Sequence, residues 1–187
     1  MKKKSLPVLI LIIVLVMIIG KGVSTYNRLV AKDEAVNHQW SQVENVLKRR
    51  ADLIPNLVNT VKGYAKHESE VLTEITKARA AVNTANGPQE QEKANNELNK
   101  ALGNINVVVE AYPELKADKN FQDLQAEIAG TENRIAVERK RYNDQVSEFN
   151  KDVRRFPTSM FASILGFPAK DYFQISQADA EVPEVSF

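Results

Sequence analysis

The histidines and carboxylates of this chain are the residues most able to support catalysis or metal binding. The sequence has two histidines, His38 and His67, and no cysteine. A di-iron site in a helical bundle uses paired Glu-x-x-His motifs, and a zinc protease uses His-Glu-x-x-His. No Glu-x-x-His motif is present, and His67-Glu68 is followed by Ser69-Glu70-Val71 instead of a second histidine. We therefore predict no metal site and no other cofactor.

Nucleophilic and phosphate-binding motifs are also missing. The sequence contains no glycine-rich phosphate loop and no Gly-x-Ser-x-Gly, and no serine has a histidine and a carboxylate suggestively spaced around it. We expect no enzymatic activity, and no small-molecule substrate is evident.

The charge balance limits the partners. The 25 Lys and Arg and 24 Asp and Glu give a formal charge of +1, and without Lys2, Lys3 and Lys4 the remainder carries −2. Nucleic-acid binding needs a basic field, so we expect no nucleic-acid partner.

Three charged residues, Arg50, Glu68 and Glu138, lie at positions where apolar residues are expected. A buried charge is costly unless it is paired and hydrogen-bonded. Arg50 and Glu138 can pair across helices and fix their register, which together with Glu68 makes a candidate polar network. The alternative, in which the helices rotate slightly and these side chains reach water, stays open.

The spacing of apolar residues predicts the helices that carry these positions. From Val36 to Val82 the apolar residues follow alternating steps of four and three, and 12 of the 14 positions are apolar or aromatic. Such spacing is typical of coiled-coil-like packing. We predict an all-α protein, an elongated up-and-down bundle that follows a transmembrane helix. Its four helical segments fall at about residues 25–53, 55–84, 90–112 and 119–155.

Pro55 interrupts the first stretch of this pattern. A proline within a helix removes one hydrogen bond and clashes with the carbonyl four residues earlier, here that of Ala51. Either one long helix is kinked at Pro55, or a new helix begins there with Asp52 as N-cap. A turn composition at residues 83–88 predicts a chain reversal, and Asp118 is a plausible N-cap for the last long helix.

The N-terminal residues predict a membrane anchor. Lys2-Lys3-Lys4 precede an apolar run from Leu6 to Ile19. The membrane-spanning segment can be lengthened to 19 residues, from Ser5 to Val23, if the Lys21 side chain extends to the lipid headgroups. The lysines predict a short cytoplasmic N-terminus, a single pass through the cytoplasmic (inner) membrane, and an extracytoplasmic remainder. A cleaved signal peptide is the alternative, but no Ala-x-Ala pattern follows the run.

We divide the chain into an anchor (1–23), a helical bundle (24–157) and an aromatic-rich C-terminal part (158–187). In this last part, Thr158 or Ser159 can cap a short helix through Leu165 that Gly166 ends, and residues 174–187 are predicted to be extended or loose. The aromatic residues either fold back onto the bundle or form an apolar patch for a partner or lipid. The candidate contact residues are Phe161, Leu165, Phe167, Tyr172 and Phe173.

Several long motifs resemble the signature of bacterial LemA proteins along nearly the whole chain. The resemblance implies a single-pass, N-terminally anchored helical bundle without an established enzymatic activity, and it brings no catalytic residues. The motifs are Tyr26-Asn27-Arg28-Leu29-Val30, Trp40-Ser41-Gln42-Val43, Arg49 to Glu68, Tyr112 to Ala117, Thr131 to Ile135, Arg141-Tyr142-Asn143 and Phe156-Pro157.

Three functions agree with these patterns. The first is a membrane-anchored, non-enzymatic scaffold or interaction protein of the cell envelope. The second is an adaptor or sensor that acts through a partner membrane protein, since the short N-terminal stub leaves no room for an output domain. The third is a self-assembling protein that organises or remodels membrane. The expected partners are the lipid bilayer and either further copies of the chain or another membrane protein.

Overall fold

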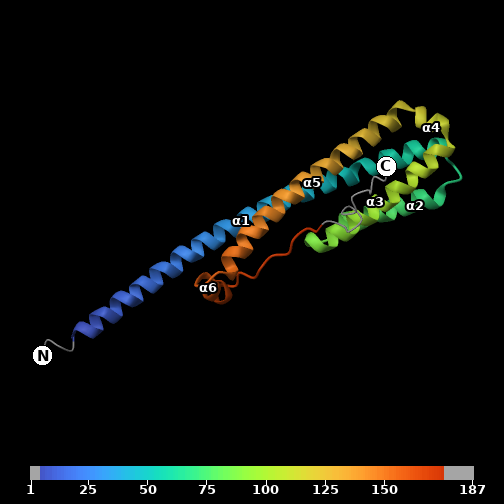
Figure 1. The fold of residues 1–187 in the computed structure, drawn as a ribbon. Coiled ribbons are helices and arrows are strands. Elements are labelled where there is room, and N and C mark those ends of the chain that lie inside the picture. The colour runs from blue at the N-terminus through green and yellow to red at the C-terminus, as the bar shows by residue number, and fades with distance from the viewer. Residues whose placement is uncertain (1–4, 175–187) are drawn as a thin grey trace, which may run out of the picture. The chain divides into compact units, whose positions relative to one another are not determined.

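The chain is all-α in the computed structural model, which describes residues 5–174 (Figure 1). No strand occurs among these described residues. The predicted cytoplasmic lysines and the predicted loose segment from residue 175 onward lie outside the described range. The helices are α1 (Ser5–Tyr64), α2 (Ser69–Thr84), α3 (Gly87–Ala111), α4 (Pro113–Ala117), α5 (Lys119–Arg154) and α6 (Thr158–Leu165).

Helix α1 runs without a break from the predicted anchor into the bundle. Its apolar side chains from Val8 to Ile19 are all exposed, and within the described chain α1 is the one helix long and apolar enough to cross a membrane. The predicted anchor and the first predicted bundle segment, at about residues 25–53, form this one helix. Of the two alternatives at Pro55, the single long helix is confirmed and a new helix beginning there is wrong, because α1 ends nine residues later, before the turn that leads to α2.

Arg79 explains how α1 tolerates Pro55. Because proline has no N–H, the carbonyl of Ala51 lacks the donor that a helix normally supplies from four residues later. Ala51 is fully buried, so water cannot replace that donor. The Nε of Arg79, on α2, donates to the Ala51 oxygen at 2.8 Å and satisfies it.

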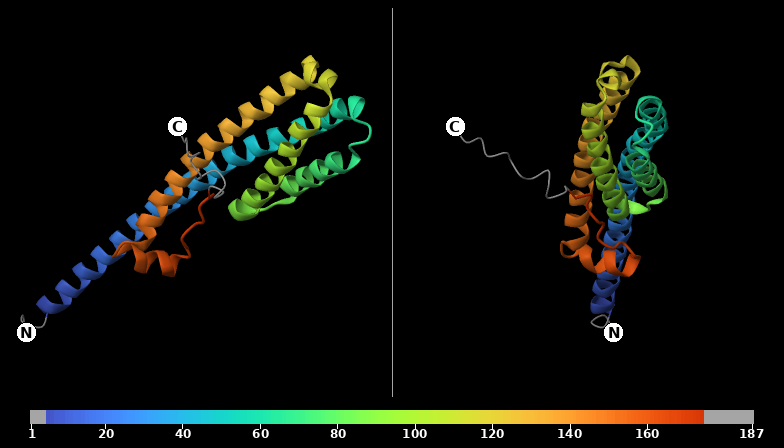
Figure 2. Two further views of the ribbon diagram at one scale, coloured as in Figure 1. Left: turned by 45° about the vertical axis from the view of Figure 1, so that its right-hand side comes forward. Right: turned by 90° about the vertical axis from the view of Figure 1, so that its right-hand side faces the viewer.

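The residues form two compact units, each described here separately. The bundle unit comprises Gln39–Asn143 and Asp171–Phe187, the latter described to residue 174, and the anchor unit comprises Met1–His38 and Asp144–Lys170, the former described from residue 5. In the bundle unit, successive long helices run in opposite directions (Figures 1 and 2). Its core includes the predicted positions Val43, Leu47, Ile54, Leu57 and Val61, all buried.

The ends of the helices confirm two predicted caps and correct a third. The carboxylate of Asp118 accepts the N–H of Phe121 at 2.8 Å, which lowers the Asp118 pKa and caps α5. Gly166 ends α6 in the left-handed conformation, with φ of 77°. Neither Thr158 nor Ser159 caps α6, because both lie inside the helix and Pro157 occupies the N-cap position. The Thr158 hydroxyl instead accepts a hydrogen bond from Arg28 at 3.0 Å.

Candidate functional site

Arg50 is the most unusual charged residue of the bundle unit. Position 50 belongs to the 4-3 pattern of apolar residues and therefore lies on the buried face of α1. Only 4% of Arg50 is exposed. Its Nη1 donates to Asn95 Oδ1 of α3 at 2.9 Å and pairs with the carboxylate of Glu132 on α5. Burial lowers the pKa of Arg50, and the charge of Glu132 opposes that shift. Arg50 therefore connects three helices.

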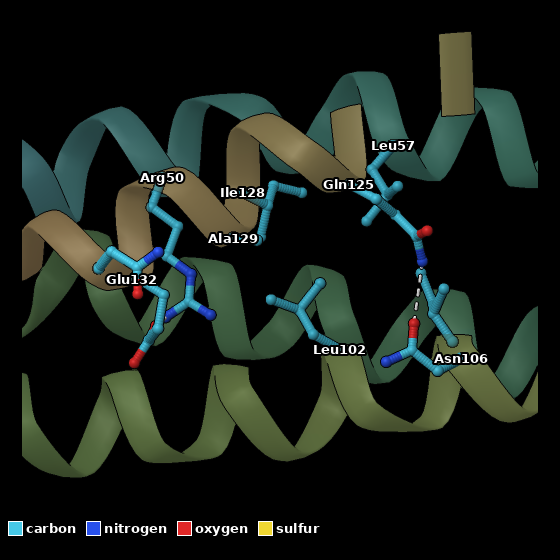
Figure 3. Close-up of a pocket in the computed structure, with 10 residues that line it drawn as sticks. Arg50, Leu57, Leu102, Asn106, Gln125, Ile128, Ala129 and Glu132 are labelled. Atoms are coloured by element: carbon cyan, nitrogen blue, oxygen red, sulfur yellow. Dashed lines mark hydrogen bonds and ion pairs between the residues drawn. The ribbon is translucent and has the colours of Figure 1, made fainter. Parts of the chain in front are cut away.

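A cleft of about 560 Å³ opens beside this cluster, between α1, α3 and α5 (Figure 3). Gln125 Nε2 donates to Asn106 Oδ1 at 3.0 Å toward the other end of the cleft. Arg50 Nε is buried and has no hydrogen-bond partner among the described residues. The apolar side chains Leu57, Leu102, Ile105 and Ile128 form about half of its walls.

The structure does not bring Arg50, Glu68 and Glu138 into one network. The partner of Arg50 is Glu132, not Glu138, which accepts hydrogen bonds from Gln39 at 2.7 Å and Arg141 at 2.8 Å. Glu68 lies in the turn after α1, where it accepts a hydrogen bond from the Tyr112 hydroxyl at 3.3 Å. The difference arises because Glu132 lies nearly two turns before Glu138 on α5, next to a predicted core position and not on it.

Two of the predicted contact aromatics lie inside or beside the bundle unit. Phe173 is buried against Trp40, with ring centroids 5.8 Å apart, and Asn143 holds its backbone with two hydrogen bonds of 2.8 and 2.9 Å. The Tyr142 hydroxyl donates to the Asp171 carbonyl at 2.9 Å. Burial, with a smaller effect of the Asp171 charge, raises the pKa of Tyr142 to about 12. Tyr172 remains partly exposed.

The other three predicted contact residues belong to the anchor unit. Phe161 packs on Gly22, where an added Cβ would lie 3.5 Å from the ring. Phe167 meets Tyr26 edge to face, with centroids 5.9 Å apart, and Leu165 is exposed. Met160 and Ile164 are more exposed than any of the five predicted residues, and sequence analysis missed them because it singled out aromatic side chains. Their i, i+4 spacing on a short apolar helix was the available signal.

Asn150 binds the backbone of Lys170, the last residue of the anchor unit, as Asn143 binds the backbone of Phe173 in the bundle unit. The Asn150 amide donates to the Lys170 carbonyl and accepts from the Lys170 N–H, both at 2.8 Å. The Lys170 ammonium pairs with Asp33 at 2.8 Å and donates to Asn37. These contacts orient the backbone of this segment.

Comparisons with known proteins agree with the resemblance noted in the sequence. The model of the LemA family matches residues 39–187. The protein named Magnetosome protein MamQ 2, from Paramagnetospirillum magneticum, is 26% identical over 80% of this chain and 64% of its own length. Protein LemA from Metamycoplasma hominis is 25% identical over 82% of this chain and 70% of its own length. The chain thus spans less than two thirds of the magnetosome relative that it matches.

Proposed function

The chain belongs to the LemA family, and from this premise we propose that it is a non-enzymatic, membrane-anchored scaffold that binds other proteins at the bacterial envelope. The observation that carries this proposal is the uninterrupted course of α1. Its first part exposes an apolar run, and its last part supplies core residues such as Ile54 and Leu57 to the bundle unit. An exposed run of this length is stable only when lipid surrounds it.

The polar contacts support a structural role for the bundle. Arg50 is bound by Asn95 and Glu132, and Arg79 is bound by the Ala51 carbonyl. Both arginines therefore act on the chain's own backbone and side chains.

We propose that the N-terminus lies in the cytoplasm and the bundle on the extracytoplasmic side, because lysines before an apolar run favour the cytoplasmic face. Because the chain has no native cysteine, a single cysteine reports its own location. A cysteine at exposed Asn86 should react with a membrane-impermeant thiol reagent in intact spheroplasts. A cysteine at Lys3 should react only after lysis. The reverse pattern would overturn the orientation.

A self-assembling, membrane-organising protein is the second candidate. The observation that favours it is the exposed apolar face of α6, which lies in the same unit as the anchor. An adaptor for another membrane protein is the alternative outcome. Cross-linking of the full chain in native membranes separates these functions: a ladder of identical subunits supports assembly, and one discrete heterologous product supports an adaptor. Monomers without any cross-linked partner would contradict both candidates and the scaffold.

A further inference from the structure

Helix α6 has one covered and one uncovered face. Thr158 and Ala162, one turn apart, are buried, whereas Met160 and Ile164, also one turn apart, are 59% and 82% exposed. Phe156, just before the helix, is also exposed. Residues four apart lie on the same side of a helix, so Met160 and Ile164 form one continuous apolar surface. A surface of this kind marks a contact with a partner or a membrane.

The position of α6 along α1 indicates that this apolar surface contacts a membrane and not a protein partner. The Phe161 ring packs on Gly22, one residue beyond Lys21 and three beyond the end of the apolar run at Ile19. Both views in Figure 2 show α6 beside this part of α1. At 1.5 Å per residue, α6 contacts α1 only about 5 Å beyond the end of the run. This is the level at which the anchor leaves the hydrocarbon of the bilayer.

The polar neighbours of α6 suit a phospholipid surface. Three nearby cations are exposed: Arg154 and Arg155, shortly before α6, and Lys21 on α1. Guanidinium groups bind phosphate with two parallel hydrogen bonds, and lysines near helix ends extend toward headgroups. Tyr26 is also partly exposed, and tyrosines are enriched at membrane–water interfaces. The apolar face, the cations and the tyrosine all belong to the anchor unit.

We propose that α6 is an interfacial helix that lies on the bilayer crossed by α1. Phe156, Met160 and Ile164 enter the boundary between headgroups and acyl chains, and Arg154 and Arg155 contact lipid phosphates. The expected depth of the apolar side chains is about 5–10 Å. The inference rests on the proposed membrane anchoring by α1. It adds a second, shallow attachment of the same unit to the same membrane.

Depth-dependent fluorescence quenching tests this proposal on the full chain in vesicles of phosphatidylcholine and phosphatidylglycerol. A single cysteine replaces Ile164 and carries an environment-sensitive dye. Because Ile164 is 82% exposed, the label does not disturb the core. Nitroxide lipids with the quencher near the headgroup should reduce the fluorescence more than lipids with the quencher deep in the acyl chain.

Two control sites separate failure of this proposal from failure of the membrane anchor. Ile19→Cys reports the end of the spanning run, and Gln145→Cys reports an exposed polar position on α5 within the same unit. Quenching at Ile19 and Ile164 but not at Gln145 supports the interfacial helix. Quenching at Ile19 alone overturns it and leaves the anchor intact. Equal quenching at Ile164 and Gln145 also overturns it, and no quenching at Ile19 contradicts both the anchor and the interfacial helix.

Discussion

Arg28 in the anchor unit and Arg50 in the bundle unit lie on the same helix, and each pairs with a carboxylate of α5. Arg28 meets Asp152 at 3.4 Å with 52% of its side chain exposed, and Lys32 shares that carboxylate at 2.9 Å. Arg50 meets Glu132 with only 5% of its side chain exposed. The exposed Arg28 can exchange its partner for water or salt ions, whereas the buried Arg50 has no such alternative.

The difference shows what each unit relies on for its stability. The bundle unit places its most costly polar groups, Arg50 and the Ala51 carbonyl, against partners within its own core. The anchor unit keeps its ion pairs at the surface and leaves the apolar face of α6 uncovered. We expect the bundle unit to be stabilised by internal contacts and the anchor unit to depend more strongly on the membrane.

The largest expected effect concerns Glu132. The change Glu132→Ala leaves Arg50 buried without its counter-charge and should lower the free energy of unfolding by about 3–5 kcal/mol. Glu127→Ala is the matched control, because Glu127 and Glu132 are both 43% exposed but the partner of Glu127, Arg49, is 56% exposed. The control should cost about 1 kcal/mol or less. Denaturant unfolding of the full chain in nanodiscs, followed by the single tryptophan Trp40, measures both.

Arg50→Met sharpens the same comparison. The Glu132 side chain is 43% exposed, so water can solvate its carboxylate when the arginine is removed. Asn95 Oδ1, however, loses its buried hydrogen-bond donor. The expected cost is therefore smaller, about 1–3 kcal/mol. Equal costs for Glu132→Ala and Glu127→Ala would mean that Arg50 reaches water in solution, and the contrast between the two units would be lost.

The second prediction concerns the carbonyl of Ala51, which Pro55 leaves without a donor from its own helix. Arg79→Met should cost about 1–3 kcal/mol, because it leaves the buried Ala51 oxygen without a donor. In a Pro55→Ala background, residue 55 regains its N–H and the same change should cost about 1 kcal/mol less. A thermodynamic cycle of the four chains measures this coupling. Additive effects would show that Arg79 does not compensate for Pro55.

The third prediction uses the titration of Tyr142. Tyr142→Phe should cost about 0.5–1.5 kcal/mol at neutral pH through the lost hydrogen bond to Asp171. The pKa of Tyr142 is raised in the fold from 10.0 to about 12, so its neutral form stabilises the fold fully below pH 10. That contribution is lost as the pH rises from 10 toward 12. The advantage of the native chain over Tyr142→Phe should shrink across this window, and a constant difference would contradict burial of the phenol.

The smallest expected effect belongs to the anchor unit. Asp152→Asn removes the shared partner of Arg28 and Lys32, both partly exposed, and should cost about 1 kcal/mol or less. The cost should fall further in 1 M salt, where screening acts over about 3 Å. Circular dichroism during thermal unfolding in nanodiscs measures it. A loss as large as that of Glu132→Ala would remove the distinction between the two clusters.

Most of the fold could be predicted because local signals specify it. The 4-3 spacing correctly identifies buried positions from Val36 to Val61, Asp118 caps α5, and Gly166 ends α6. The course of α1 past Pro55 could not be predicted in the same way. It depends on Arg79, which lies 28 residues away from Ala51 in sequence and reaches it only after the chain has reversed.

The candidate sites were predicted less well, because they depend on rotations of single helices about their axes. Arg50 was recognised from its position, but its partner Glu132 lies beside the predicted stripe and not on it. Phe156, part of one of the LemA-like motifs, is exposed just beyond the end of α5 at Arg154. The aromatic residues drew attention to α6, while its most exposed apolar side chain is Ile164.

The bond between Arg79 and Ala51 also constrains how this sequence can change over evolutionary time. A lineage that retains Pro55 cannot readily lose Arg79, whereas one that first replaces Pro55 is free to vary residue 79. The order of the two substitutions therefore decides whether the intermediate protein carries an unsatisfied, buried Ala51 carbonyl. Among diverging descendants of this chain, we expect Pro55 without an arginine at position 79 to be the rarest of the four combinations.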